Sequence, residues 1–201
     1  MTERVVGVLA RPDPELPAAL ASALLEDVID LVSEMPMVTP MVATVSSRGG
    51  HDAGHLTWPT TAVIDVAERT GVADALRALA AAAPGAVAVT LLAPDVPDLP
   101  ALLVGKLFSA VAGPRRPVVA VCPARGGGAV AVAAAVPLPG WLAASGVRLD
   151  DADALDRLRA DAPQGGVVVV PGWHRIRTLA DLSLLDPALE GWDATRAYLL
   201  S

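Results

Sequence analysis

Two carboxylates three residues apart, Asp95 and Asp98, are the side chains of this sequence best placed to do chemistry. They follow a largely apolar run at 86–92, which predicts a strand buried on both faces of a parallel sheet. In open α/β sheets, ligands bind beyond the carboxyl ends of the strands. Asp95 could therefore hold a metal ion or a sugar hydroxyl. Equally, Asp98 could cap or orient the next helix, and Asp95 could be a turn residue.

The three histidines offer weaker candidates for chemistry. His51 and His55 are four residues apart and could share a metal ion. They lie in or near the segment 46–54, however, whose several glycines disfavour a helix there. We expect a solvated loop instead. His174 follows an expected strand and could act as a general base. Packing beside Trp173 or a hydrogen bond to the backbone is the simpler interpretation.

The elements that must position these side chains alternate along the chain. Apolar residues at spacings of three and four predict helices, and short apolar runs between Gly and Pro predict strands. We expect strands at 5–9, 41–45, 61–66, 86–92, 118–122, 129–136 and 167–170, and helices at 15–34, 68–83, 101–111, 150–160, 178–185 and 186–201. This alternation predicts an α/β fold of three layers, α/β/α, with a mainly parallel sheet and a single domain over 1–201.

Composition excludes several classes of protein. The chain of 201 residues is 53% hydrophobic and 18% charged, which argues against disorder. Its net charge of −7 disfavours general binding to nucleic acid or to anionic membranes. One cysteine, Cys122, excludes an internal disulfide, and no signal segment opens the chain. We expect a soluble cytoplasmic protein with no nucleic-acid or membrane partner, for which a homodimer is possible.

Three segments carry a resemblance to a known family. They are 93–100 (APDVPDLP), 122–127 (CPARGG) and 175–182 (RIRTLADL). In sequence and order they resemble motifs of the nucleotide-diphospho-sugar transferase superfamily, the glycosyltransferase-A type of fold. Within this superfamily, the chain resembles small bacterial glycosyltransferase-like proteins and 2-phospho-L-lactate guanylyltransferases. The resemblance implies a nucleotidyltransferase or glycosyltransferase-like protein that binds a nucleotide or another phosphorylated small molecule.

The same resemblance implies a set of site residues. Asp95 takes the place of the family's metal ligand, so it is the expected catalytic residue and would hold Mg²⁺ or Mn²⁺ if the protein is active. The expected ligand-binding residues lie in the loop after the first strand and around the three motifs. They are Ala10, Arg11, Asp98, Arg125, Gly126, Gly127, His174, Arg175 and Arg177.

Several family positions differ in this chain. The acidic residue of the second motif is Gly126 here, and the two acidic positions of the third motif are Arg175 and Arg177. Metal-dependent catalysis is therefore in doubt. One hypothesis is that the arginines replace the metal and hold an anionic ligand, since guanidinium groups pair bidentately with phosphate and carboxylate. The other is that they pair with Asp95, Asp98, Asp181 or Asp186 and neutralise an unused site. A non-catalytic anion-binding protein, or a dimerising interaction protein, is the alternative to an enzyme.

Overall fold

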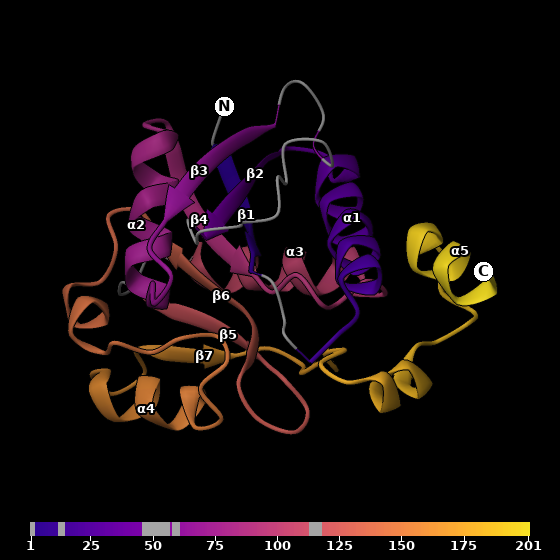
Figure 1. Cartoon of the computed structure of the whole chain (residues 1–201). Helices are drawn as coiled ribbons and strands as arrows, with labels where there is room; N and C mark the ends of the chain where they lie inside the picture. The colour runs from indigo at the N-terminus through magenta and orange to yellow at the C-terminus, as the bar shows by residue number, and fades with distance from the viewer. Residues whose placement is uncertain (1–2, 12–14, 46–56, 58–60, 113–117) are drawn as a thin grey trace.

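The computed structural model describes residues 3–11, 15–45, 57, 61–112 and 118–201. The strands found there are β1 (Glu3–Ala10), β2 (Val38–Val45), β3 (Ala62–Val66), β4 (Ala86–Leu92), β5 (Val119–Pro123), β6 (Ala129–Ala135) and β7 (Val167–Val169). They form one sheet in the order β3-β2-β1-β4-β6-β5-β7 (Figure 1). β6 runs antiparallel to β4 and β5, and the other neighbouring pairs are parallel. The predicted α/β fold with a mainly parallel sheet is confirmed.

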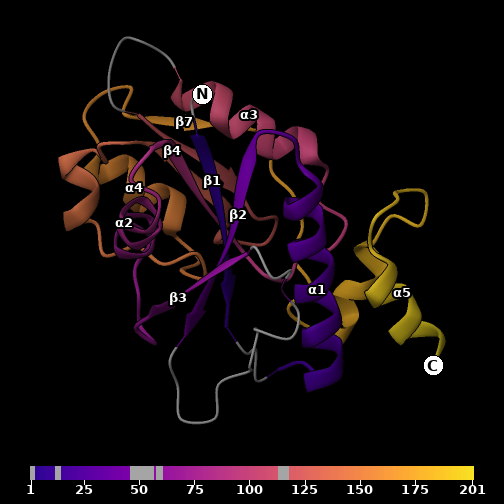
Figure 2. The same ribbon diagram turned by 90° about the horizontal axis from the view of Figure 1, so that it is seen from above.

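Helices cover both faces of this sheet. They are α1 (Ala18–Glu34), α2 (Val72–Ala82), α3 (Ala101–Val111), α4 (Ala154–Asp161) and α5 (Asp193–Leu200), with 3-10 helices η2 (Gly140–Ala144) and η3 (Leu179–Leu184). α1 and α3 lie on one face, and α2 and α4 lie on the other (Figures 1 and 2). Successive side chains of a strand point to opposite faces. Accordingly, Val6 and Val8 of β1 belong to the core under α1 and α3, and Val5 and Leu9 to the core under α2.

β2 begins earlier than the predicted residue 41 and contains Pro40. Proline cannot donate a hydrogen bond, so it is tolerated only where a strand has a free edge. Pro40 pairs with Val6 of β1, whereas the pairing of β2 with β3 begins one residue later, at Met41. Pro40 therefore lies where β2 is still an edge strand.

The C-terminal segment is wrapped against α1 rather than against the sheet (Figure 1). Trp192 and Ile176 pack with Leu20 and Leu24 of α1 in a small separate apolar cluster. Asp27, buried in α1, accepts hydrogen bonds from the backbone N–H groups of Ala194 and Thr195 and from the Thr195 hydroxyl. Because those donors belong to the first turn of α5, Asp27 anchors this helix to α1.

The helices expected after residue 150 are shorter than predicted. The last helix starts at Asp193 instead of 186, since Pro187 and Gly191, which has a positive φ of 89°, interrupt the segment. The segment expected to be helical at 178–185 is the 3-10 helix η3. The helix expected at 150–160 begins at Ala154. None of the described helices is both long and apolar enough to cross a membrane.

Candidate functional site

Three chain segments that follow strands meet at one edge of the sheet. Arg11 follows β1, Asp95 follows β4, and the segment 174–177 follows β7. The backbone fixes two of these segments together, because the N–H of Ile176 donates to the carbonyl oxygen of Asp95 at 2.8 Å. This is the edge at which the carboxyl ends of the parallel strands lie, the usual position of ligand sites in such sheets.

Arg175 lies at the centre of this edge and is 8% exposed. Its Nε donates to Oδ1 of Asp95 at 2.7 Å, and its Nη1 lies 2.8 Å from Oδ1 of Asp150. Nη1 also donates to the carbonyl oxygens of Ala129 and Leu149, at 3.3 and 3.4 Å. A buried guanidinium is tolerated when it is paired and hydrogen-bonded in this way.

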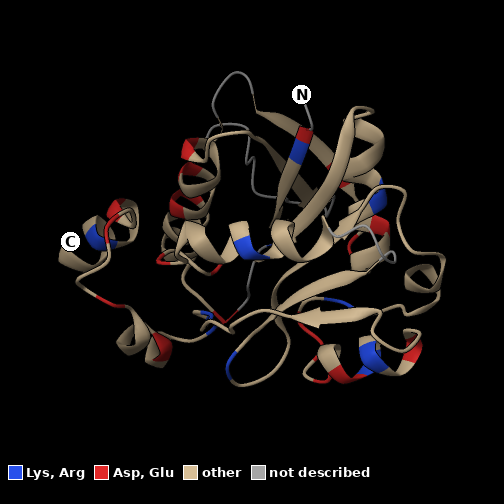
Figure 3. Cartoon of the chain, turned by 180° about the vertical axis from the view of Figure 1, so that it is seen from behind, with Lys and Arg blue, Asp and Glu red and all other residues tan. Residues whose placement is uncertain are grey.

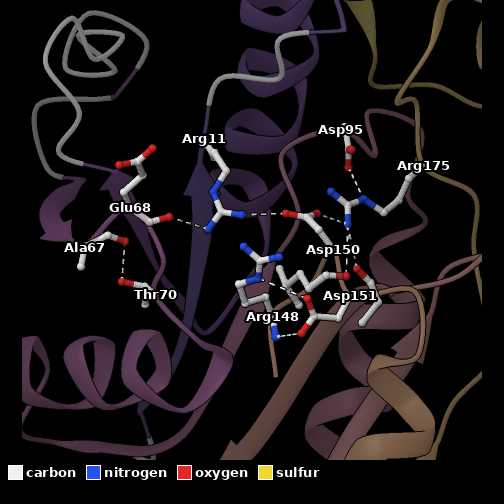
Figure 4. Close-up of polar contacts among 11 residues, drawn as sticks. Arg11, Ala67, Glu68, Thr70, Asp95, Arg148, Asp150, Asp151 and Arg175 are labelled. Carbon is white, nitrogen blue, oxygen red and sulfur yellow. Dashed lines mark hydrogen bonds and ion pairs between the residues drawn. The ribbon is translucent and has the colours of Figure 1, made fainter. Parts of the chain in front are cut away.

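Asp150 stands between two arginines that come from opposite ends of the chain (Figure 4). Its Oδ2 accepts a hydrogen bond from Nη1 of Arg11 at 2.7 Å, and its Oδ1 faces Arg175. Arg11 is also held by the carbonyl oxygen of Glu68 at 3.2 Å. The Asp150 side chain is 38% exposed, so its carboxylate lies at the mouth of the site.

The ionisation of these groups is coupled through Arg175. Burial lowers the pKa of Arg175, but the carboxylates of Asp95 and Asp150 outweigh it, so the pKa lies above its usual value and the group stays charged. Burial raises the pKa of Asp95 above its usual value, and Arg175 acts against that rise. Burial also acts to raise the pKa of Asp150, yet Arg175, Arg11 and Arg177 prevail and the pKa is lowered.

A cavity of about 340 Å³ opens beside these charges. Its polar wall consists of Arg11, Asp95, Asp150, Arg175 and Arg177. The other described lining residues are Leu9, Ala10, Leu16, Ala21, Leu24, Leu25, Pro94 and Leu149. The cavity thus combines charged groups at the strand termini with an apolar wall, formed by side chains from the end of β1, from α1 and from the segments next to them.

The residues at this edge do not fit a divalent cation. Mg²⁺ and Mn²⁺ are held by several oxygen ligands, usually carboxylates. In the described residues, no group of three or more His, Cys, Asp or Glu side chains could hold a metal ion. The carboxylate predicted as a metal ligand, Asp95, is instead bonded to the guanidinium of Arg175. A cation would have to displace that guanidinium and lie beside the remaining arginines.

Solved structures with the same architecture identify the fold. No family model and no curated protein matches the chain in sequence. A candidate nucleotide-diphospho-sugar transferase from Desulfovibrio desulfuricans G20 superposes with a TM-score of 0.70 at 15% identity, over 100% of this chain and 96% of that one. The chain has the nucleotide-diphospho-sugar transferase fold. The predicted resemblance to this superfamily is thereby confirmed at the level of the fold.

Two nucleotidyltransferases share this fold. CMP:2-keto-3-deoxy-manno-octonic acid synthetase, solved in complex with CTP, matches with a TM-score of 0.62 at 13% identity over 90% of this chain and 96% of that one. A cytidylyltransferase from Leptospira borgpetersenii also gives 0.62, at 11% identity over 99% and 93%.

Within this nucleotide-diphospho-sugar transferase fold, the predicted site residues separate into two groups. Ala10, Arg11, Asp95, Arg175 and Arg177 line the cavity together. The remaining five do not line it. They are Asp98, Arg125, Gly126, Gly127 and His174. The histidines His51 and His55 lie outside the described residues.

Asp98 and His174 belong to a buried contact behind the cavity. Oδ1 of Asp98 accepts a hydrogen bond from Nε1 of Trp173 at 3.0 Å and lies 2.9 Å from Nε2 of His174. Its Oδ2 accepts a hydrogen bond from the backbone N–H of Asp186 at 3.2 Å. The rings of Trp173 and His174 are stacked, with centroids 4.9 Å apart. Asp98 therefore fastens the chain around 173–186 to the end of β4.

The glycine segment positions the site from outside. Arg125 and Gly126 are exposed. The backbone N–H of Arg125 donates to the carbonyl oxygen of Trp173 at 2.8 Å, which ties this turn to the segment that carries Arg175. A Cβ built on Gly128 would lie 2.6 Å from the carbonyl oxygen of Leu149 and 2.7 Å from Nη2 of Arg177. The close approach of these groups thus requires glycine at 128.

Sequence reasoning missed Asp150 and the apolar wall. The acidic residues at 150–160 are not all solvated: the side chain of Asp151 is 13% exposed and accepts hydrogen bonds from Arg148 and Arg157. No signal in the local sequence separates Asp150 from its neighbours, because its partners lie 139 and 25 residues away.

Proposed function

We propose that the protein binds a nucleotide or another phosphorylated small molecule in the cavity at the strand ends, with arginines in place of a metal ion. The observation that carries this proposal is the buried contact of Arg175 with Asp95, the carboxylate expected to hold the metal. Around it, the described part of the cavity contains three arginines and two aspartates, a local balance of +1. In a chain of net charge −7, this is an exception.

The charge of the remaining chain is mostly acidic. Acidic residues recur along α1, as the ribbon seen from behind shows (Figure 3). Guanidinium groups at fixed positions can form two parallel hydrogen bonds to a phosphate, and such charge-assisted bonds contribute about 1.5–3 kcal/mol each. Because the neighbouring nucleotidyltransferase was solved with CTP, CTP is the first nucleotide to test.

Charge reversal at Arg177 tests the proposal. We expect Arg177→Glu to weaken the binding of CTP, GTP or pyrophosphate at least about tenfold in isothermal titration calorimetry, the equivalent of about 1.4 kcal/mol. The matched control is Arg125→Glu, which makes the same charge change on an exposed residue outside the cavity and should leave affinity unchanged.

Metal dependence distinguishes this proposal from a metal-dependent transferase. We expect phosphate affinity to be the same in EDTA and in millimolar Mg²⁺ or Mn²⁺, since no step of binding uses a cation. Binding that appears only with the metal would contradict the proposal and restore the enzyme with Asp95 as metal ligand. Equal affinities of the Arg177→Glu and wild-type proteins would also contradict it.

A further inference from the structure

The apolar wall of the cavity indicates what chemistry the ligand has beyond its phosphate group. The uncharged described residues that line the cavity are all apolar, and four of them, Leu16, Ala21, Leu24 and Leu25, lie in or just before α1 rather than next in the chain to one of the charged lining residues. Small-molecule sites recognise polar ligand groups with a few well-placed polar side chains. The polar side chains described in this cavity are the arginines and aspartates at the strand termini. Among the described residues, a sugar or a nucleobase would find no polar side chain along this wall.

We propose that the cavity binds a phosphate ester of an apolar alcohol, an alkyl phosphate in its simplest form. The phosphate lies at Arg11, Arg175 and Arg177, and the hydrocarbon chain lies against the beginning of α1. This inference rests on the proposed function and names the class of its ligand.

The position of the wall follows from the fold. Leu16, Leu24 and Leu25 are 7%, 1% and 5% exposed, so the cavity reaches apolar side chains that are otherwise covered. Leu16 and Leu24 also pack with Trp192 and Ile176 of the C-terminal part of the chain. This packing holds the wall in place. Burial of each additional methylene against such a wall tightens binding about fourfold until the cavity is filled.

Ala21 offers a way to shorten the cavity without disturbing the charged groups. It lines the cavity and is half-buried on α1, where leucine is also a good helix former, second only to alanine. Ala21→Leu places three more carbon atoms beside the wall. Its control is Ala19→Leu, two residues away on the same helix, where the side chain is exposed.

The experiment is a chain-length series of ethyl, butyl, hexyl and octyl phosphate, titrated by calorimetry. For the wild type and Ala19→Leu, we expect affinity to rise with chain length, about fourfold per methylene at first and then level off. For Ala21→Leu, we expect ethyl phosphate to bind as in the wild type and the longer esters to lose at least about tenfold.

Each outcome separates the two proposals. If the esters bind with equal affinity at every chain length, the apolar-ligand inference is wrong while the phosphate site stands. If affinity rises with chain length but Ala21→Leu behaves as Ala19→Leu does, the chain lies elsewhere and the inference is also wrong. If neither ethyl phosphate nor CTP binds, the proposed function itself fails.

Discussion

At the scale of single residues, the site depends on one guanidinium that serves two carboxylates. Arg175 is the hydrogen-bond partner of Asp95 and faces Asp150 at 2.8 Å. Removing one partner of a buried ion pair leaves an uncompensated charge, which commonly costs 3–5 kcal/mol. Without Arg175, the buried unpaired charge would be the carboxylate of Asp95. Its residue is 5% exposed, and burial already raises its pKa.

We therefore expect Arg175→Met to lower the free energy of unfolding by about 3–5 kcal/mol at pH 7 in urea denaturation. Arg175→Met combined with Asp95→Asn should recover most of that loss, because no buried carboxylate then lacks a partner.

The stability of Arg175→Met should also depend on pH. A buried carboxyl of raised pKa keeps its proton longer in the folded state, so Arg175→Met should regain stability as the pH falls toward 4. Equal stabilities of the single and double variants would show that the unpaired carboxylate of Asp95 is not the cause of the loss.

Sequence alone predicted all but one of the described charged residues that line the cavity. Arg175 and Arg177 stood out because they replace acidic positions in a motif, and Asp95 because it follows a buried strand. Asp150 could not be found in this way. It lies among other carboxylates, and only the folded chain brings it between Arg11 and Arg175. The apolar wall was hidden for a related reason: Leu16 and Leu24 satisfy the periodicity of an ordinary core-facing helix.

At the scale of elements, the turn between β5 and β6 sets the distance between two parts of the site. Gly128 has a positive φ of 82°, a conformation that favours glycine, and its Cα faces Leu149 and Arg177. The sequence drew attention to Gly126 and Gly127 in the same turn. The contact with the site, however, is made at Gly128, whose partners are distant in sequence.

Gly128→Ala should destabilise the protein by at least about 1–3 kcal/mol, because the new methyl group meets a backbone carbonyl in a strained backbone conformation. It should also weaken phosphate binding, since Leu149 and Arg177 must move away. Gly105→Ala in α3 is the control: nothing lies within 4 Å of its Cβ position, and helix propensity predicts a gain of about 0.5–1 kcal/mol. Thermal denaturation and calorimetry of both variants provide the test. A Gly128→Ala protein with wild-type stability and affinity would mean that the turn does not position the site.

At the scale of the whole molecule, the ionisation of Cys122 depends on whether the sheet and its covering helices stay closed. It lies in β5, is 1% exposed, and belongs to the core between the sheet and the helices α1 and α3. Its thiol donates to the carbonyl oxygen of Pro171, and burial raises its pKa to about 11. The thiol is therefore protonated in the folded state at a pH where it ionises freely in the unfolded chain.

As a consequence, we expect the protein to lose stability in alkaline solution over a defined pH range. The folded state holds the thiol proton more tightly than the unfolded chain does. The stabilisation that the protonated thiol gives the folded state is therefore complete below pH 9 and is lost as the pH rises from 9 toward 11. A shift of about two pKa units corresponds to about 2–3 kcal/mol. Urea unfolding of the wild type and Cys122→Ala under reducing conditions, at pH 7 to 11, isolates this effect, since every other group titrates in both proteins. The two stability curves should run parallel up to pH 9 and converge above it. Curves that stay parallel to pH 11 would mean that water reaches Cys122 and that this part of the core opens without global unfolding.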